Sequence, residues 1–147
     1  MDHWFFIQEA LREAQKSLAQ GGLPIGAILV HQQQIIGRGH NQRVQKKSPI
    51  LHAEMDALEN AGRLSAKIYQ ECVMYTTLSP CDMCTGAILL YKIPQVIIGE
   101  NQNFRGAEDL LQQKGVHVTV LQHPDCIDIM QNYIKQYPKL WHEDIGI

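Results

Sequence analysis

The sequence lacks any apolar run of the roughly 18 residues that a membrane-spanning helix needs, so we expect no membrane partner. It also lacks a basic surplus, because 13 Lys and Arg stand against 15 Asp and Glu, for a formal net charge of -2. Proteins that bind a phosphate backbone usually carry a basic face, so we do not expect a nucleic-acid partner. A basic leader segment is missing too, since Asp2 follows Met1, and we expect a cytoplasmic location.

Cysteine is scarce, at 4 of 147 residues. In a reducing compartment cysteines are more often metal ligands or buried thiols than disulfides. Cys72 and Cys126 each stand alone in apolar sequence, which is typical of packed thiols. Cys81 and Cys84 form a C-x-x-C pair, which fits either a redox dithiol or half of a zinc site.

The chain has 147 residues, 45% hydrophobic and 19% charged, which predicts one folded domain over 1–147. Apolar periodicity predicts helices at 2–20, 52–61, 81–91, 106–114 and 124–137, and strands at 25–31, 35–40, 72–77, 95–99 and 116–121. Segment 41–50 is expected to be a loop. The tail 138–147, which contains Trp141, is too apolar to be dismissed as a frayed end.

Strands and helices alternate in the second half of the chain, and short links join them. Such units predict parallel neighbouring strands with right-handed crossovers. The expected fold class is therefore α/β, a three-layer α/β/α sandwich around a mixed sheet of about five strands. The first two strands are expected to be antiparallel and the later ones parallel.

Two short motifs stand where predicted helices begin: H-A-E at 52–54 and P-C-D-M-C at 80–84. Helix N-termini favour thiolates through their free N–H groups and the positive end of the helix dipole. His52, Cys81 and Cys84 would supply one nitrogen and two sulfurs, which leaves the fourth tetrahedral position for water and is typical of a catalytic zinc ion. Glu54, in the first turn, is placed to reach the same pocket as a general base.

H-x-E followed by P-C-x-x-C is the signature of zinc nucleobase deaminases. The sequence resembles the cytidine and deoxycytidylate deaminase superfamily over nearly its whole length, and is most similar there to fungal-type free-base cytosine deaminases. The segments that carry this resemblance are GRGHN at 37–41, YTTLSPCDMCTGAI at 75–88, GENQNF at 99–104 and WHEDIG at 141–146. The cysteine block alone also suits tRNA adenosine deaminases and guanine deaminases, whereas the tail is more selective.

The resemblance implies a role for each of several residues. His52, Cys81 and Cys84 would hold one zinc ion per chain, and Glu54 would shuttle protons. The nucleobase would be bound by Asn41 and Asp144, walled by Phe104 and Trp141, supported from below by Ile25, and contacted by the Ser79 carbonyl and the backbone amides of Ala53 and Cys81. The resemblance also implies a homodimer, and segment 138–147 would serve as a lid over the site.

The expected reaction is hydrolytic deamination of a free nucleobase, cytosine to uracil and ammonia, by a hydrolase acting on a C–N bond of a cyclic amidine. Two departures from the fungal pattern, Ala53 for glycine and Val44 for an aromatic residue, keep a guanine-type or isocytosine-type deaminase open as an alternative.

A tRNA adenosine deaminase is a less favoured alternative, based on the basic residues Arg38, Arg43, Lys46 and Lys47. A catalytically inactive deaminase-fold module, serving as an interaction partner, would be expected to have lost part of the ligand set. This chain keeps every ligand position and Glu54.

Overall fold

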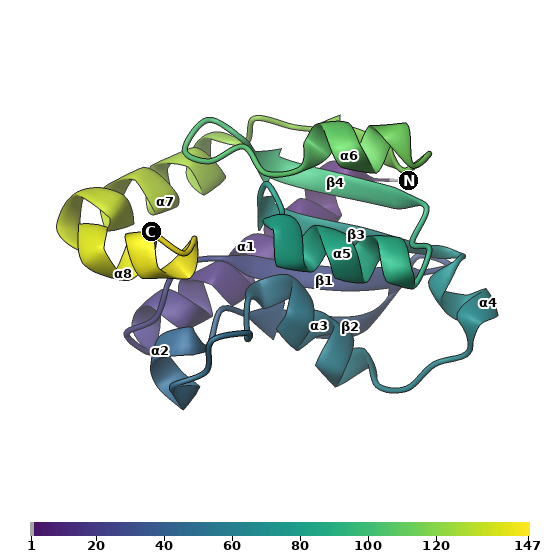
Figure 1. Cartoon of the computed structure of the whole chain (residues 1–147), viewed down its shortest axis with the longest axis horizontal. Coiled ribbons are helices and arrows are strands. Elements are labelled where there is room, and N and C mark those ends of the chain that lie inside the picture. Colours follow the sequence, from purple (N-terminus) through teal and green to yellow (C-terminus); the bar gives the residue numbers. More distant parts are fainter. Residues whose placement is uncertain (1) are drawn as a thin grey trace.

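The computed structural model describes residues 2–147, which contain a five-stranded mixed sheet in the order β2-β1-β3-β4-β5 (Figure 1). Its strands are β1 (Gly26–His31), β2 (Gln34–His40), β3 (Cys72–Leu78), β4 (Gln95–Glu100) and β5 (His117–Val120). β1 pairs antiparallel with β2 and β3, whereas β3, β4 and β5 run parallel. The expected α/β class is thus confirmed, with its antiparallel first hairpin and later parallel strands.

The helices are α1 (His3–Ala19), α2 (Arg43–Lys46), α3 (Ala53–Ala61), α4 (Ala66–Tyr69), α5 (Asp82–Leu90), α6 (Glu108–Gln113), α7 (Pro124–Gln136) and α8 (Pro138–Asp144). All five expected helices are present, the one at 106–114 in shortened form as α6. The expectation of a loop throughout 41–50 is wrong, because α2 lies inside it, and α4 and α8 were not expected as helices either. A helix of four residues makes one turn, which is too short for an apolar period to show in the sequence.

The ends of the helices follow their local sequence. The Asp2 carboxylate accepts a hydrogen bond from the Phe5 backbone N–H at 3.0 Å, which caps α1 as expected. Gly21 and Gly62, with φ of +87° and +88°, lie just beyond the C-terminal ends of α1 and α3. Glycine adopts this left-handed conformation without steric cost, so these residues end their helices.

Helices cover both faces of the sheet (Figure 1). One face packs against α1 through a buried cluster that includes Phe6, Ile7, Ala10, Ile28 and Tyr75. The other face packs against α3, α5 and α6 through a second cluster that includes Ala57, Ile88, Leu111, Leu29 and Met74. β3 is buried along its whole length, so the residues that follow its C-terminal end begin in the interior of the molecule.

α3 lies directly on β2, because a Cβ atom at Gly39 would overlap the backbone nitrogen of Ala57. Only glycine permits this close approach of the two backbones. The N-terminal end of α3 is thereby held at the end of β2, next to Asn41. This packing sets the distance between two of the segments that form the site described below.

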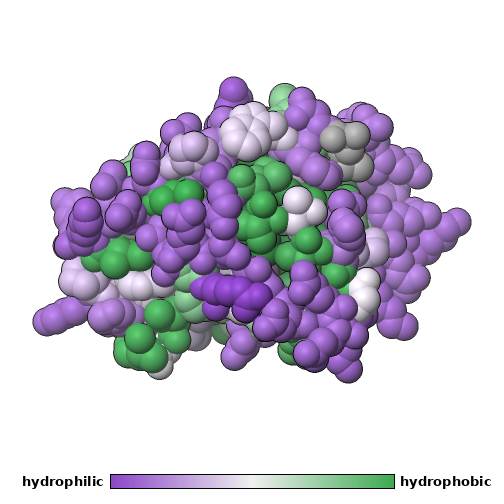
Figure 2. All heavy atoms as spheres, turned by 90° about the horizontal axis from the view of Figure 1, so that it is seen from above, coloured by the Kyte–Doolittle hydropathy of each residue, from purple (hydrophilic) through white to green (hydrophobic). Residues whose placement is uncertain are grey.

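Figure 2 looks onto the side of the molecule that carries α6 and β4 in Figure 1, where hydrophobic residues gather in the middle of a hydrophilic surface. β5 forms the edge of the sheet next to β4, and its residues 118–120 are half-buried. None of the helices within residues 2–147 has the length and hydropathy needed to cross a bilayer.

Candidate active site

The metal-ligand candidates lie at two neighbouring helix starts. His52 immediately precedes α3, Cys81 immediately precedes α5, and Cys84 lies in the first turn of α5. The side chains of His52 and Cys81 do not cap their own helices, which leaves them available to each other. β3 ends at Leu78, so three residues connect the buried end of this strand to Asp82, where α5 begins.

The three side chains converge on one point. His52 Nδ1 lies 3.3 Å from Cys81 Sγ and 3.8 Å from Cys84 Sγ, and the three ligand atoms all lie within 4.8 Å of one another. Tetrahedral zinc has Zn–S bonds of about 2.3 Å and Zn–N bonds of about 2.0 Å, which place its ligand atoms roughly 3.5–3.8 Å apart. The donor set and its spacing therefore fit a zinc ion with three protein ligands. Across residues 2–147 this is the one such group.

The electrostatics of the ligand set also favour a cation. A hydrogen bond from the Cys84 thiol, together with His52, lowers the pKa of Cys81 to about 4, whereas the same hydrogen bond and burial raise the pKa of Cys84. Burial lowers the pKa of His52, but the hydrogen bond with Cys81 and the nearby carboxylates outweigh it and raise the pKa to about 9. Zinc binds a neutral histidine and thiolates, so its binding releases the protons that the raised pKa values of His52 and Cys84 retain at neutral pH.

Cys72 and Cys126 are buried free thiols outside the ligand group, which confirms their interpretation as packing residues. Cys72 donates a hydrogen bond to the Ile68 carbonyl at 3.1 Å, and Cys126 belongs to the cluster beneath α1. Neither is placed to add a fourth ligand, so the site keeps the open position that catalysis requires.

Glu54 lies in the first turn of α3, buried, and lines the same cavity as His52 and Cys81. The expectation that a first-turn residue reaches this pocket is thereby confirmed. Burial is the main cause that raises the pKa of Glu54 to about 7, and the negative charge of Cys81 adds to it. A carboxyl group whose pKa lies near neutral is suited to take up and release a proton.

Five of the predicted substrate-binding residues line this cavity: Ile25, Ser79, Phe104, Trp141 and Asp144. Ala53 and Asn41 are fully buried beside it and do not line it. Leu78 and Ile145 also line it and were not predicted. Both are immediate neighbours of predicted residues, which was the only signal for them in the sequence.

The C-terminal helix α8 carries two of these side chains, Trp141 and Asp144, into the cavity that His52 and Cys81 line. Trp141 packs edge-on against Phe104, with 5.8 Å between the ring centroids and 82° between the ring planes. One carboxylate oxygen of Asp144 lies 3.4 Å from His52 Nε2 and accepts a 2.7 Å hydrogen bond from Asn41 Nδ2. Burial raises the pKa of Asp144, while His52 and Asn41 act in the opposite direction.

Two buried acids hold the loop that carries Phe104, and the sequence signalled neither role. The Glu100 carboxylate accepts hydrogen bonds from the backbone N–H groups of Gln102 and Asn103. Glu108 accepts a 2.6 Å hydrogen bond from the Ser79 hydroxyl, whose oxygen in turn accepts one from the Gly106 N–H. The loop is therefore fastened to the segment that leads into Cys81.

Comparison with known proteins agrees with this geometry. Residues 1–100 match the family described as the cytidine and deoxycytidylate deaminase zinc-binding region. The chain belongs to this deaminase family. The resemblance drawn from the sequence is thus confirmed, and the deaminase is a zinc enzyme with His52, Cys81 and Cys84 as its metal site.

Several relatives match this deaminase over most of its length. A cytosine deaminase of Candida albicans is 55% identical over 141 residues, which cover 95% of this chain and 94% of that protein. A tRNA-specific adenosine deaminase of Streptococcus pyogenes is 40% identical over 142 residues, covering 90% and 89% respectively. Among solved structures, a guanine deaminase from Bacillus subtilis superposes with a TM-score of 0.60 at 30% identity, covering 80% of this chain and 72% of that one.

Proposed function

We propose that this deaminase hydrolyses cytosine to uracil and ammonia. The observation that carries the proposal is that Trp141 and Asp144, from the tail motif shared with fungal-type cytosine deaminases, line one cavity with His52 and Cys81. The 55% identity to the Candida albicans cytosine deaminase over 95% of the chain supports the same substrate.

Recognition of a free base follows from Asp144 and Asn41. A buried carboxylate needs N–H partners, because an unpaired buried charge is costly. A free cytosine offers a ring N–H next to a carbonyl group, whereas in a nucleoside that nitrogen carries the sugar. Phe104 and Trp141 wall the ring and Ile25 lies beneath it. In this proposal the backbone amides of Ala53 and Cys81 contact the ring carbonyl.

The proposed mechanism assigns the proton transfers to Glu54. When bound, zinc lowers the pKa of a coordinated water and so supplies a nucleophile at neutral pH. Glu54 takes up one proton of the attacking water and delivers it to the ring nitrogen. It then takes up the second proton, from the hydroxyl group now on the ring carbon, and delivers it to the amine, so that the C–N bond breaks and ammonia leaves. The Ser79 carbonyl accepts a hydrogen bond from that amine. Segment 138–147 acts as a lid that excludes water during these steps.

A purine or isocytosine-type base is the second candidate. Val44, at the position where the fungal pattern has an aromatic residue, is 37% exposed on α2 and does not line the cavity. Val44 therefore does not supply the aromatic wall of the fungal pattern, and this departure favours a purine or isocytosine-type base as the second candidate. Transfer RNA is less favoured, because Arg38 pairs with Glu9 at 2.8 Å and Arg43 lies 3.9 Å from Asp144, so two charges of the basic cluster face acids.

We further propose that the enzyme works as a homodimer in the cytoplasm. Leu90 and Tyr91, at the end of α5, are 70% and 42% exposed, and Tyr91 lines a groove together with Met55 and Leu58 of α3. A second copy would cover these apolar side chains. A reducing compartment would keep Cys81 and Cys84 available for zinc. Sedimentation of the purified protein distinguishes a dimer from a monomer.

Ammonia release from a panel of bases tests the proposed substrate. The panel contains cytosine, 5-substituted cytosines, isocytosine, guanine, adenine and cytidine, with the zinc content measured on the same sample. We expect the highest kcat/KM for cytosine. Preferred turnover of cytidine would overturn the free-base assignment, and preferred turnover of guanine would establish the second candidate.

A further inference from the structure

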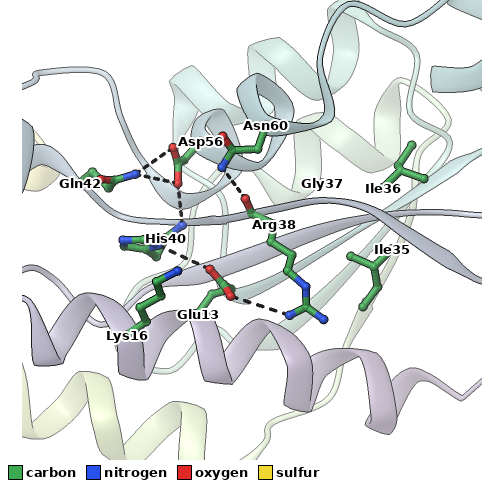
Figure 3. A pocket seen from close by; sticks show the side chains of 10 residues that line it. All are labelled: Glu13, Lys16, Ile35, Ile36, Gly37, Arg38, His40, Gln42, Asp56 and Asn60. Atoms are coloured by element: carbon green, nitrogen blue, oxygen red, sulfur yellow. Dashed lines mark hydrogen bonds and ion pairs between the residues drawn. The ribbon is translucent and has the colours of Figure 1, made fainter.

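Asp56 lies one helical turn after the zinc ligand His52 but has no place in the mechanism above. Its backbone N–H donates a 2.9 Å hydrogen bond to the His52 carbonyl, so the two residues share the first turn of α3. Asp56 is only 3% exposed. Figure 3 shows its carboxylate directed toward His40 and Gln42, at the end of β2.

The Asp56 carboxylate binds the residues on both sides of Asn41. One oxygen accepts a 3.0 Å hydrogen bond from the backbone N–H of His40, and the amide of Gln42 lies 3.1 Å from both oxygens. Two other acids reach β2 from α1. Glu9 pairs with the Arg38 side chain at 2.8 Å, and Glu13 lies 3.7 Å from Arg38 and 3.5 Å from the His40 ring (Figure 3 shows Glu13). Asp56 differs from both because its carboxylate binds His40 and Gln42, the residues on either side of Asn41.

Asn41 is itself fully buried and is fixed at each polar group. Its backbone N–H donates to the Ile25 carbonyl at 3.0 Å, and its carbonyl accepts a 2.7 Å hydrogen bond from the Ser17 hydroxyl. Its side-chain amide donates to Asp144. A shift of the chain at residues 40–42 therefore moves the amide that holds the Asp144 carboxylate in the cavity.

We propose that Asp56 is a positioning residue, which holds Asn41, and through it Asp144, at a set distance from the zinc end of α3. One helical turn then places both the metal ligand His52 and the pair that binds the base. The bonds to Asp56 come from neutral N–H donors, and they offset the cost of burying its charge. This inference rests on the proposed function, in which Asn41 and Asp144 bind the nucleobase.

Steady-state kinetics of Asp56→Asn test the proposal. The amide has nearly the shape of the carboxylate, but an NH2 group replaces one of the two oxygens. With its remaining oxygen toward the His40 N–H, the variant turns a donor toward the Gln42 amide, where the carboxylate offers an acceptor. We expect KM for cytosine to rise about tenfold, kcat to change less than twofold and zinc to stay at one ion per chain, the pattern of lost ground-state binding. The matched control is Glu9→Gln, which alters another buried acid bound to β2 and is expected to leave KM unchanged.

Asn41→Ala separates positioning from general stabilisation. If Asp56 acts through Asn41, Asp56→Asn has no further effect on KM in the Asn41→Ala background. The proposal would be overturned if the factors by which Asp56→Asn and Asn41→Ala raise KM multiply in the double variant. It would also be overturned if Asp56→Asn lowers the melting temperature and leaves KM unchanged. Gln42→Ala removes one of the two residues that donate hydrogen bonds to Asp56, and Gln42 is only half-buried. This variant is expected to raise KM by a smaller factor. It provides the test if Asp56→Asn does not fold.

The failure of this inference is distinguishable from failure of the proposed function. If the parent enzyme releases no ammonia from cytosine, the proposed substrate is wrong, and the same KM comparison is made with the base that the panel identifies. If the parent is active and Asp56→Asn binds its base as well as the parent does, the positioning role is wrong while the function stands.

Discussion

The side-chain amide of Asn41 donates a 2.7 Å hydrogen bond to the carboxylate of Asp144, across 103 positions of the chain. Both side chains are buried, and the same carboxylate oxygen lies 3.4 Å from His52 Nε2. The C-terminal segment is therefore attached at the metal centre, and changes near the end of the chain are expected to alter substrate binding.

Asp144→Asn tests that attachment. The neutral amide presents a second donor group toward Asn41 and loses the negative charge that a ring N–H would meet. We expect KM for cytosine to rise about tenfold or more, which corresponds to at least about 1.4 kcal/mol. The matched control is Glu143→Gln, which neutralises the exposed neighbouring acid and is expected to leave KM unchanged. Equal effects of the two substitutions would contradict the role of Asp144.

Glu54→Gln removes the proposed proton carrier and leaves the three metal ligands in place. We expect kcat to fall by roughly 10²–10⁴-fold, the usual contribution of general acid–base catalysis. The zinc content, measured by atomic emission, should remain at one ion per chain. Glu59→Gln, on the exposed part of the same helix, serves as the control and should retain parental kcat. Near-full turnover by Glu54→Gln would show that another group moves the proton.

Gly106→Ala is expected to disrupt the loop that carries Phe104. A Cβ atom at this position would overlap the Pro80 carbonyl oxygen, which cannot move without shifting Cys81. We expect kcat/KM to fall more than tenfold. Gly86→Ala is the matched control, because nothing lies within 4 Å of a Cβ atom there and the residue is inside α5. Alanine within a helix is favoured over glycine by roughly 0.5–1 kcal/mol, so this control should melt slightly higher.

Metal removal is expected to expose one reactive thiol. Without zinc the pKa of Cys81 is about 4, so at pH 7 it is a thiolate, and its side chain is partly accessible. Burial raises the pKa of Cys72 to about 11 and that of Cys126 to about 12, so both stay protonated. Iodoacetamide labelling followed by peptide mass spectrometry should modify Cys81 first after chelation. Prior labelling of Cys126 in the folded protein would contradict this order.

Cys126 also predicts a loss of stability at alkaline pH. Its pKa is raised from 9.0 to about 12 in the folded chain, chiefly by burial. Between these values the unfolded chain has released the proton and the folded chain keeps it, so the free energy of unfolding falls as pH rises. One such group contributes a slope of at most about 1.4 kcal/mol per pH unit.

Urea titrations from pH 8 to 11 compare the parent with Cys126→Ala. The variant should have a lower free energy of unfolding than the parent at pH 8, because it loses packing. The difference between the two free energies should become smaller as the pH increases. If the difference in free energy of unfolding is constant over this range, the Cys126 thiol does not titrate differently in the folded and unfolded chains.

Local signals in the sequence were sufficient for most of the fold. The apolar periods, the Asp2 cap and the glycines after α1 and α3 all act over a few residues, and each located an element within a few positions of its observed ends. The short helices α2 and α4 were not predicted, because a single helical turn is too short for an apolar period to show in the sequence. Their formation depends on the neighbours that fix their ends.

The metal centre was equally accessible from the sequence, since a nitrogen and two sulfurs at helix starts have a chemistry of their own. Cys81 and Cys84 are three residues apart, and His52 and Glu54 are two residues apart. Each of these two pairs, which together form the site, is therefore local in the sequence. The spacing in the sequence does not determine the distance between the His52–Glu54 pair and the Cys81–Cys84 pair. That distance is set by the packing of α3 on β2 and by the position of α5 at the end of β3.

The sequence by itself determined the sheet, the five predicted helices and the identity of the zinc ligands, because these follow from short-range propensity and from side-chain chemistry. Only the tertiary structure decided what surrounds the zinc. An acid that is the fourth residue from the end of this chain is by default a solvated charge, and nothing local distinguishes Asp144, Asp56 or Glu108 from exposed acids. Their partners lie in other elements of the fold, and burial together with those hydrogen bonds turns each of them into part of the site.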